Sequence, residues 1–322
     1  MMVMSEIVRI LKSSKKVLIV THISPDGDGI GSTLALLHGL NKLGIEGDIV
    51  IDDDVPGDFR FLPKSDKILK YSPEIENHYD AAVAIDCSDE GRMGRAEELY
   101  SKVPVKINVD HHISNTMYAD YNVVDSNSGA CAELVYQLIK LLGVEFDNRI
   151  ATCLYCSLAT DTGRFMYGNT TSITHEVAAD LLNNGADLRK ISEEIFEKKT
   201  LSQVLLICEA LKTLRVVEDG SIAYIVVTKA MLEKCGAKPS DTEGLVYYPR
   251  CIDGVEIGLL FKEEDGRIKV SFRSKALDVS KVAAVFGGGG HVLASGCFVE
   301  APMEEAIERV VRACADAIKG GR

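Results

Sequence analysis

The sequence predicts an α/β protein of two domains, in which a largely parallel sheet with flanking helices is followed by a smaller α+β domain. The first observation is a set of short apolar runs that alternate with longer helical stretches, the rhythm of a parallel sheet covered by helices. The second is a change after residue 214 to β-like runs separated by acidic turns that contain glycine. The third is the length of 322 residues, which suits two domains better than one.

The expected elements follow in chain order. The N-terminal segment lacks the long apolar stretch and the cleavage site of an export signal, so an amphipathic helix is expected there. Strands of the parallel sheet are expected at 17–20, 47–51, 81–85 and 106–109. Helices are expected at 129–142, 148–159, 174–184, 187–213, 279–286 and 303–318. We therefore divide the chain into a first domain at 1–190, a helical linker at 191–214 and a second domain at 215–322, with a cleft between the two lobes.

Composition restricts the possible partners. The apolar fraction is 46%, and no apolar run approaches the ~18 residues of a membrane helix, so we expect a cytoplasmic protein without a membrane partner. The net charge of -12 argues against long duplex nucleic acid, because binding it needs a broad basic surface. A small anion needs only a local group of cations and backbone N–H groups. The nine scattered cysteines predict no disulfide framework, and Cys153 with Cys156 is interpreted as a pair of small core residues.

Acidic and histidine side chains follow the expected strands of the first domain. His22, Asp26 and Asp28 lie between the first strand and a helix, at the carboxyl edge of the sheet where ligands of open α/β sheets bind. Three later segments end in the same kinds of group. These are Asp86 after 81–85, Asp110 with His111 and His112 after 106–109, and Asp161 at the end of 148–159.

Such a group of carboxylates indicates a bound cation. Carboxylates brought together alone repel one another and raise each other's pKa. Oxygen and imidazole donors without thiolate favour Mn²⁺, Mg²⁺ or Co²⁺ over structural zinc. Each motif alone has a simpler interpretation, since an aspartate after a strand can cap a helix and a DHH sequence can be a surface turn. Their joint occurrence at element ends in one lobe favours the metal, with Asp110 orienting His111 or His112 as an outer partner. His38, His78 and His175 lack acidic partners at ligand spacing and are assigned structural or solvent roles.

A second constellation lies near the C-terminus. Arg273 and Ser274 end an expected strand, and a run of glycines ends at His291. Consecutive glycines let backbone N–H groups approach an anion closely, and arginine can grip a phosphate with two hydrogen bonds. A glycine run alone could be a flexible loop, but together with Arg273 and His291 it favours a phosphate or nucleotide site.

At this point the chain resembles the DHH phosphoesterase family, specifically its members with a DHH-associated C-terminal domain that act as nanoRNases and as phosphatases of adenosine 3',5'-bisphosphate. The motifs that carry the resemblance are HISPDGDGIGS, AIDCS, VDHHISN, ATDTGRF with the following NTT, and FRS with GGGGH. They extend from Thr21 to Gly296, nearly the whole chain. Only Cys87, beside Asp86, departs from the small residues usual there.

The resemblance implies a role for each matched residue. One metal would be held by His22, Asp26 and Asp86, and a second by Asp28, Asp86, His111 and Asp161, so that Asp86 bridges the pair. His112, with Asp110 behind it, would stand beside the scissile phosphate. The substrate clamp would comprise Arg273, Ser274, Gly288, Gly289, Gly290 and His291, and Arg92 is a further candidate that faces the cleft.

The expected function is therefore hydrolysis, with two divalent ions of which Mn²⁺ is preferred, of short single-stranded oligoribonucleotides from the 5' end and of adenosine 3',5'-bisphosphate to AMP. A linear dinucleotide phosphodiesterase acting on pApA or pGpG is the main alternative, and a pyrophosphatase or exopolyphosphatase is a weaker one because its substrates carry no base. A nucleic-acid binding module with a decayed metal site is disfavoured by the intact ligand set. The preferred substrate, the physiological metal and the oligomeric state, a homodimer included, stay open.

Overall fold

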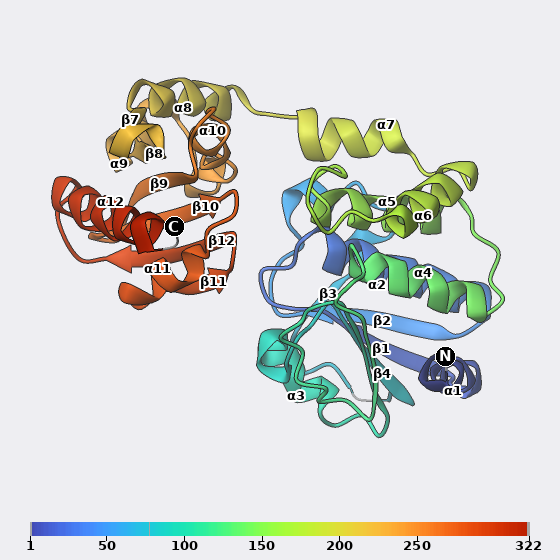
Figure 1. The fold of residues 1–322 in the computed structure, drawn as a ribbon. Helices are drawn as coiled ribbons and strands as arrows, with labels where there is room; N and C mark the ends of the chain where they lie inside the picture. Colours follow the sequence, from blue (N-terminus) through green and yellow to red (C-terminus); the bar gives the residue numbers. More distant parts are fainter. Residues whose placement is uncertain (1, 77, 321–322) are drawn as a thin grey trace. The chain divides into compact units, whose positions relative to one another are not determined.

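The computed structural model describes residues 2–76 and 78–320 and separates into two compact units, Met1–Lys198 and Lys199–Arg322 (Figure 1). The boundary falls inside the segment expected to link the domains. Each unit is built around its own six-stranded sheet.

The first unit contains a parallel sheet with the strand order β3-β2-β1-β4-β5-β6. Its strands are β1 (Lys16–Val20), β2 (Glu46–Ile51), β3 (Leu69–Lys70), β4 (Ala81–Ile85), β5 (Lys106–Asp110) and β6 (Tyr121–Val124). The chain builds outward from β1 to one side and then returns to add β4 on the other. The carboxyl ends of β1 and β4 therefore flank the point where the strand order reverses, which is where ligands bind in such sheets.

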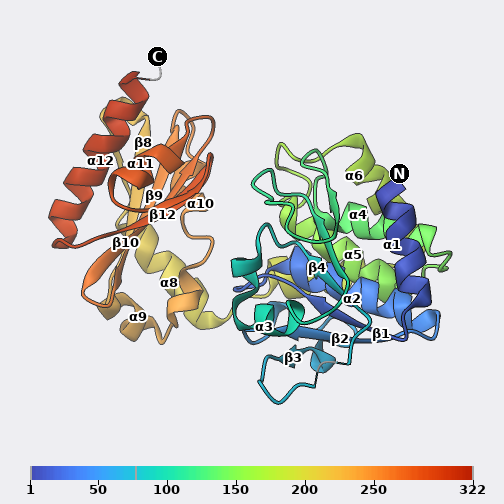
Figure 2. The same cartoon turned by 90° about the horizontal axis from the view of Figure 1, so that it is seen from below.

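Helices cover both faces of this sheet (Figures 1 and 2). The α-helices are α1 (Met2–Ser13), α2 (Gly27–Lys42), α3 (Glu97–Tyr100), α4 (Cys131–Leu141), α5 (Asn148–Asp161), α6 (Ser172–Asn183) and α7 (Leu188–Ile191), and a π-helix follows at Ser192–Glu197. Short 3₁₀ helices lie at Gly57–Phe59, Ser65–Lys67 and Glu90–Ala96. Neighbouring strand residues point to opposite faces, so Ile19 belongs to the core that includes residues of α1, α2, α4 and α5, whereas Leu18 belongs to the core that includes residues of α3.

Helices α2 and α5 approach one another closely because small residues line their contact. A Cβ atom on Gly31 would lie 2.5 Å from the carbonyl oxygen of Cys153 and 2.4 Å from Ser157 Oγ. Cys153 and Cys156 are fully buried here, as expected of small core residues. This close packing matters because α2 and α5 each carry residues of the candidate site.

The second unit contains a mixed sheet with the order β11-β12-β10-β9-β8-β7, in which only β8 and β9 pair in parallel. Its strands are β7 (Arg215–Val217), β8 (Ile222–Val227), β9 (Ile257–Glu264), β10 (Arg267–Ser274), β11 (Gly289–His291) and β12 (Ala294–Val299). Its helices are α8 (Leu201–Lys212), α9 (Lys229–Cys235), α10 (Tyr247–Arg250), α11 (Val279–Val285) and α12 (Met303–Gly320), with 3₁₀ turns at Glu218–Gly220 and Pro239–Thr242.

Two separate cores hold this unit together. Helices α11 and α12 pack on one face of the sheet, where Phe261 and Phe272 are fully buried. Helices α8 and α9 pack on the other face, through Leu206 and Ala210 of α8 among others. Helix α8, expected within the linker, thus belongs to the second unit.

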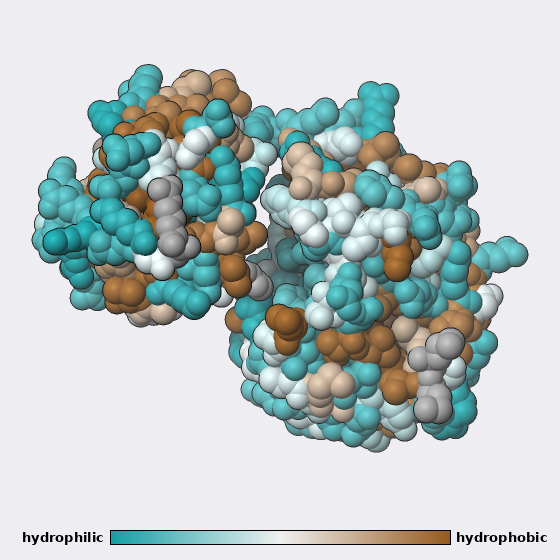
Figure 3. Space-filling view, in the orientation of Figure 1, coloured by the Kyte–Doolittle hydropathy of each residue, from teal (hydrophilic) through white to brown (hydrophobic). Residues whose placement is uncertain are grey.

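Hydrophilic side chains cover most of the surface seen in Figure 3, and hydrophobic ones gather in small separate groups. Within the described residues, every helix is too short or too polar to span a bilayer.

Candidate metal centre and anion site

The loop after β1 provides the first residues of the candidate metal centre. His22 directs Nδ1 to the carbonyl oxygen of Ile23 at 2.8 Å, which leaves Nε2 to face the site. Asp26 is the N-cap of α2, and its Oδ1 accepts the N–H groups of Asp28 and Gly29 at 2.9 and 3.1 Å. The same oxygen lies 3.8 Å from His22 Nε2. Asp26 therefore caps the helix and also faces the candidate site.

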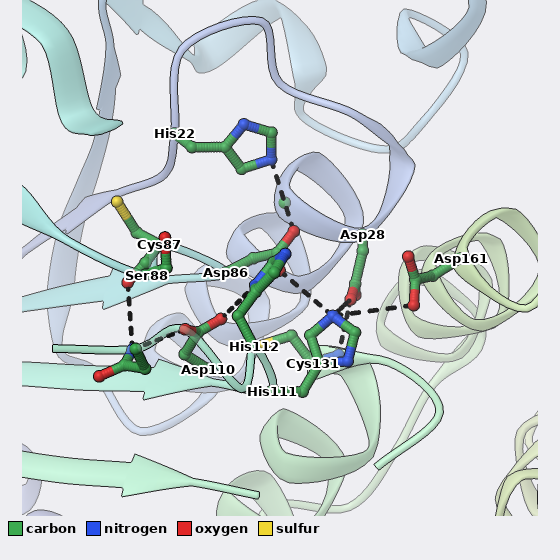
Figure 4. A network of polar contacts seen from close by, with 12 residues as sticks. His22, Asp28, Asp86, Cys87, Ser88, Asp110, His111, His112, Cys131 and Asp161 are labelled. Carbon is green, nitrogen blue, oxygen red and sulfur yellow. Dashed lines mark hydrogen bonds and ion pairs between the residues drawn. The ribbon is translucent and has the colours of Figure 1, made fainter. Parts of the chain in front are cut away.

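Asp86 occupies the centre of the group and directly follows β4 (Figure 4). Its two oxygens face different partners, because Oδ2 lies 3.5 Å from His22 Nε2 and Oδ1 lies 3.6 Å from His111 Nε2. The side chain is 3% exposed, and Oδ1 accepts no hydrogen bond from any described residue. Asp86 also has a left-handed backbone (φ 57°), which costs a non-glycine residue about 1 to 3 kcal/mol. A buried carboxylate with a strained backbone and one oxygen without a hydrogen bond suits a cation as its partner.

A second group forms around His111. Its Nε2 lies 3.8 Å from Asp28 Oδ2 and 3.7 Å from Asp161 Oδ2, while its Nδ1 lies 3.2 Å from the carbonyl oxygen of Ser128. Asp28 is held firmly, because it accepts the N–H groups of Cys131 and Ala132 at the start of α4, at 2.6 and 3.1 Å. The start of a helix favours a negative charge, which partly offsets the burial of this carboxylate.

The distances and the donor atoms fit divalent cations. Nitrogen to oxygen separations of 3.5 to 3.8 Å are too long for hydrogen bonds. Two atoms that each lie about 2.1 Å from one ion are about 3 to 3.5 Å apart, so small movements would bring these ligands onto shared ions. Three overlapping groups could hold a metal ion. They are His22, Asp26 and Asp86; Asp28, His111 and Asp161; and Asp86, His111 and His112.

The pKa shifts show the electrostatic cost of this arrangement without a cation. Burial, reinforced by the charges of Asp86 and Asp161, raises the pKa of Asp28 well above its ordinary value. Burial also raises the pKa of Asp161 to about 6, although His111 opposes the shift. Burial opposes protonation of His22, but its contacts with Asp26 and Asp86 raise its pKa to about 10. Protons thus partly neutralise a cluster that a metal ion could neutralise instead.

His112 differs from the other two histidines in its partner. Asp110 is fully buried, and its Oδ1 lies 2.8 Å from His112 Nδ1. The sequence did not decide whether Asp110 orients His111 or His112, and the structure shows that it orients His112. The hydrogen bond to Asp110 raises the pKa of His112. Asn115 fixes the other end of Asp110 by donating from Nδ2 to Oδ2 at 2.6 Å, and also donates to Asn108 at 2.8 Å.

Some contacts were not anticipated from the sequence. Asn115 and Asn169 both lie in the motifs that carry the resemblance, but the sequence predicted no role for either. Asn169 donates to the carbonyl oxygen of Gly129 at 2.8 Å and lies 3.3 Å from Asp161 Oδ2. The guanidinium of Arg92, a substrate candidate, lies 3.3 Å from His22 Nδ1. Burial raises the pKa of Cys87 to about 12, so it behaves as an inert small residue beside Asp86.

The three histidines assigned elsewhere lie in other surroundings. His38 bonds to the carbonyl oxygen of Pro63, and His175 stacks on Phe165. Exposed His78 pairs with Glu76, so the expectation that it lacks an acidic partner is wrong, although the pair lies at the surface.

The expected clamp in the second unit is only partly brought together. Adjacent residues of a strand face opposite ways, so Arg273 points outward from β10 whereas Ser274 is 2% exposed on the inner face. Ser274 Oγ donates to Glu256 at 3.1 Å and accepts the N–H of Leu277 at 2.7 Å, which holds the turn after β10. Ser274 thus serves the turn and lies on the face of β10 opposite Arg273, and a joint grip of both residues on one phosphate stays a prediction.

The last two glycines of the run, Gly289 and Gly290, begin β11, the edge strand beside β12. A Cβ atom on Gly288 would lie 2.2 Å from the carbonyl oxygen of Gly296, and Gly290 has a positive φ of 142°, so the tight pairing itself requires glycine. Gly289 has open space at its Cβ position. An edge strand also keeps N–H groups unpaired on its free side, which suits an anion. The side chain of His291 lies outside the described part of the structure.

Comparisons with known proteins agree on both units. Residues 16–158 match the model of the DHH family, N-terminal domain, and residues 219–320 match that of the DHHA1 domain. The chain is 34% identical over 304 residues to the bifunctional oligoribonuclease and PAP phosphatase NrnA of Thermus thermophilus, covering 92% of this chain and 88% of that protein. The protein of the same name from Bacillus subtilis is 28% identical, with 92% and 93% covered.

Among solved structures, an exopolyphosphatase-related protein from Bacteroides fragilis is similar with a TM-score of 0.91 and 28% identity, covering 97% of this chain and 95% of that chain.

Proposed function

The chain belongs to the DHH family, and we propose that it is a metal-dependent phosphoesterase that hydrolyses short oligoribonucleotides from the 5' end and adenosine 3',5'-bisphosphate to AMP. The observation that carries this proposal is the buried Asp86, whose two oxygens face two separate sets of metal-type ligands. The two NrnA relatives, named as oligoribonuclease and PAP phosphatase, support the choice of substrates.

The ligand set suits two divalent ions, and its mixture of carboxylate and imidazole favours Mn²⁺, with Co²⁺ or Mg²⁺ as alternatives. His22, Asp26 and Asp86 would hold one ion. The second would be held by Asp28, Asp86, His111 and Asp161. Two such ions supply a water of lowered pKa and neutralise charge on the phosphate oxygens.

The other residues of the centre position a proton donor. Asp110 binds Nδ1 of His112, which turns Nε2 toward a ligand and favours the protonated ring by raising its pKa. A protonated His112 can donate to a nonbridging oxygen or to the leaving 3'-oxygen as the phosphoester bond breaks. Asn115 keeps Asp110 in place for this task.

The second unit would recognise the terminal phosphate. Arg273 supplies a charged donor, and the N–H groups of Gly289 and Gly290, together with His291, complete the proposed clamp. Gly288, also expected in the clamp, donates its N–H to the carbonyl oxygen of Ala283 at 2.9 Å and offers none to a phosphate. Cutting at the 3'-oxygen of the first nucleotide releases a 5'-mononucleotide from an oligonucleotide and AMP from the bisphosphate. One bond geometry thus explains both activities. Arg92 is kept as a candidate contact near His22.

Two other activities use the same chemistry. A linear dinucleotide phosphodiesterase would cut the same kind of bond in pApA or pGpG. An exopolyphosphatase is suggested by the name of the similar Bacteroides protein, but the two NrnA relatives, at 34% and 28% identity, favour nucleotide substrates.

A hydrolysis panel with Mn²⁺ tests the proposal. Its substrates are adenosine bisphosphate, oligoribonucleotides of two to many residues, pyrophosphate, polyphosphate and cyclic dinucleotides. We expect the bisphosphate and the shortest oligonucleotides to be preferred, and Asp86→Ala to abolish turnover by disturbing both ions. Asp66→Ala, which removes an exposed acidic group of the same unit, is the control. Preference for pyrophosphate or polyphosphate, or an active Asp86→Ala at saturating Mn²⁺, would contradict the proposal.

A further inference from the structure

The outer face of β10 carries a row of polar and cationic side chains. Residues at 268, 270, 272 and 274 are buried, so Arg267, Lys269, Ser271 and Arg273 share the opposite face. Toward β8 and β9 this face is covered by helices and by the segment 239–246. Between that segment and β10 lies a hollow of about 430 Å³. Its polar floor includes Lys262, Lys269, Ser271 and Arg273.

The two lysines of the hollow differ in how their charges are balanced. Lys262 and Lys269 lie directly opposite one another on β9 and β10, an arrangement that is unfavourable for like charges. Lys262 Nζ is neutralised by Glu264, 2.7 Å away. Lys269 instead lies 5.8 Å from the ring centroid of Phe298, and none of the ion pairs among the described residues includes it. Glu243 also lines the hollow, at its exposed side.

The hollow is continuous with the proposed clamp, because Arg273 belongs to both. Arg273 and Lys269 are four residues apart on one strand face, a backbone distance of about 13 to 14 Å. Two long side chains at that spacing can reach the two ends of one oligophosphate. A terminal monophosphate at Arg273 would leave the hollow and Lys269 unused.

We propose that this hollow binds the β and γ phosphates of a nucleotide 5'-triphosphate whose α-phosphate lies at Arg273. The inference rests on the proposed function and extends its substrates to short oligoribonucleotides with a 5'-triphosphate. Water attacks the phosphorus of the first internucleotide bond, the bond to the 3'-oxygen breaks, and that oxygen takes up a proton. The triphosphate itself is not cut. The dinucleotide pppApA therefore yields ATP and AMP.

Hydrolysis of pppApA and pApA by the Mn²⁺-loaded protein tests the inference. We expect the wild type to cleave both and to release intact ATP from pppApA. Lys269→Met should lower kcat/KM for pppApA by about tenfold to a hundredfold, the loss expected for one charge-assisted hydrogen bond. Its kcat/KM for pApA should stay within a factor of about two. Ser271→Leu, which fills the hollow without changing charge, should show the same selectivity.

A matched control is Lys281→Met, which removes an exposed cation from α11 in the same unit and should affect neither substrate. Equal losses on pppApA and pApA, or no loss on either, would overturn the inference. Failure of the wild type to cleave pApA would instead refute the proposed function, so the two failures are distinguishable.

A second experiment separates the RNA end from a free nucleotide as the ligand. ATP, AMP and tripolyphosphate are compared as inhibitors of adenosine bisphosphate hydrolysis with Mn²⁺ in excess over all of them. Inhibition by ATP that weakens in Lys269→Met, without cleavage of pppApA, would assign the hollow to free nucleoside triphosphates. Cleavage of pppApA that depends on Lys269 assigns it to RNA ends. If ATP inhibits no better than AMP and pppApA cleavage does not depend on Lys269, the hollow is not a triphosphate site.

Discussion

Replacing Asp161 by asparagine tests whether repulsion between the carboxylates of the centre destabilises the metal-free protein. Asp161 ends α5 and lies 3.7 Å from His111, and burial raises its pKa from 3.8 to about 6. A carboxyl group whose pKa is raised on folding adds stability below its unfolded pKa and loses it as the pH rises through the folded value. Asparagine has the same shape and no charge, so the substitution removes this loss of stability at high pH.

The size of the effect follows from the shift. A rise from 3.8 to about 6 corresponds to about 3 kcal/mol at pH 8. The side chain is 26% exposed, and solvent at that exposure reduces the figure to about 2 kcal/mol. For a unit of this size, 1 kcal/mol changes the melting temperature by about 2 to 4 °C. We therefore expect Asp161→Asn to melt several degrees above the wild type at pH 8 in the presence of chelator.

Thermal unfolding at several pH values, with chelator and with Mn²⁺, is the assay. The advantage of Asp161→Asn should vanish near pH 4, and Mn²⁺ should stabilise the wild type more than the variant. Asp180→Asn is the control of opposite sign, because the hydrogen bond from Tyr136 lowers the pKa of Asp180 and makes its charged form stabilising. A variant no more stable than the wild type at pH 8, or one with the same advantage at pH 4, would refute the repulsion argument.

Three further predictions concern the metal, the substrate and the fold. Chelator-treated protein should regain activity best with Mn²⁺ or Co²⁺ and less with Mg²⁺, and full activity without a divalent ion would exclude the two-metal proposal. The wild type should cleave a 5'-phosphorylated dinucleotide faster than an unphosphorylated one, whereas Arg273→Ala should cleave both about equally poorly. Measuring kcat/KM for both substrates shows whether Arg273 recognises the 5'-phosphate. Gly31→Ala should destabilise the protein by about 1 to 3 kcal/mol, because its Cβ would meet the Cys153 carbonyl, whereas Gly57→Ala, with open space, should have little effect in thermal unfolding.

The sequence was sufficient to predict the parallel sheet and the second, mixed domain. Both patterns are local, since a buried parallel strand appears as a short apolar run wherever it lies in the chain. The edge strand β3 and the 3₁₀ segments were not predicted, because two exposed residues such as Leu69 and Lys70 carry no periodic signal. Helix α8 was assigned to a linker because its charged flanks concealed Leu206 and Ala210, which pack on the second sheet.

The candidate ligands could be named from the sequence because the carboxyl ends of neighbouring parallel strands must meet at one edge. Which oxygen faces which partner could not be named, since it depends on side-chain torsion and on the left-handed backbone of Asp86. Strand alternation, which separates Ser274 from Arg273, could already have been applied to the sequence. The contacts of Asn115 and Asn169 depend on loops that bring residues together across the site, and no periodicity reveals them.

The arrangement of the centre links metal binding to the stability of the first unit. The candidate ligands come from the ends of β1, β4 and β5 and from helices α2 and α5, so bound ions would join elements that meet only in the folded state. Asp86 is unfavourable at this position in three respects: its carboxylate is buried, its backbone is strained, and one of its oxygens accepts no hydrogen bond. A cation would offset the buried charge and also take up the oxygen that has no hydrogen bond, whereas one proton would neutralise the charge and leave that oxygen without a partner. A residue that is unfavourable in the metal-free fold is thus the one that two ions would share.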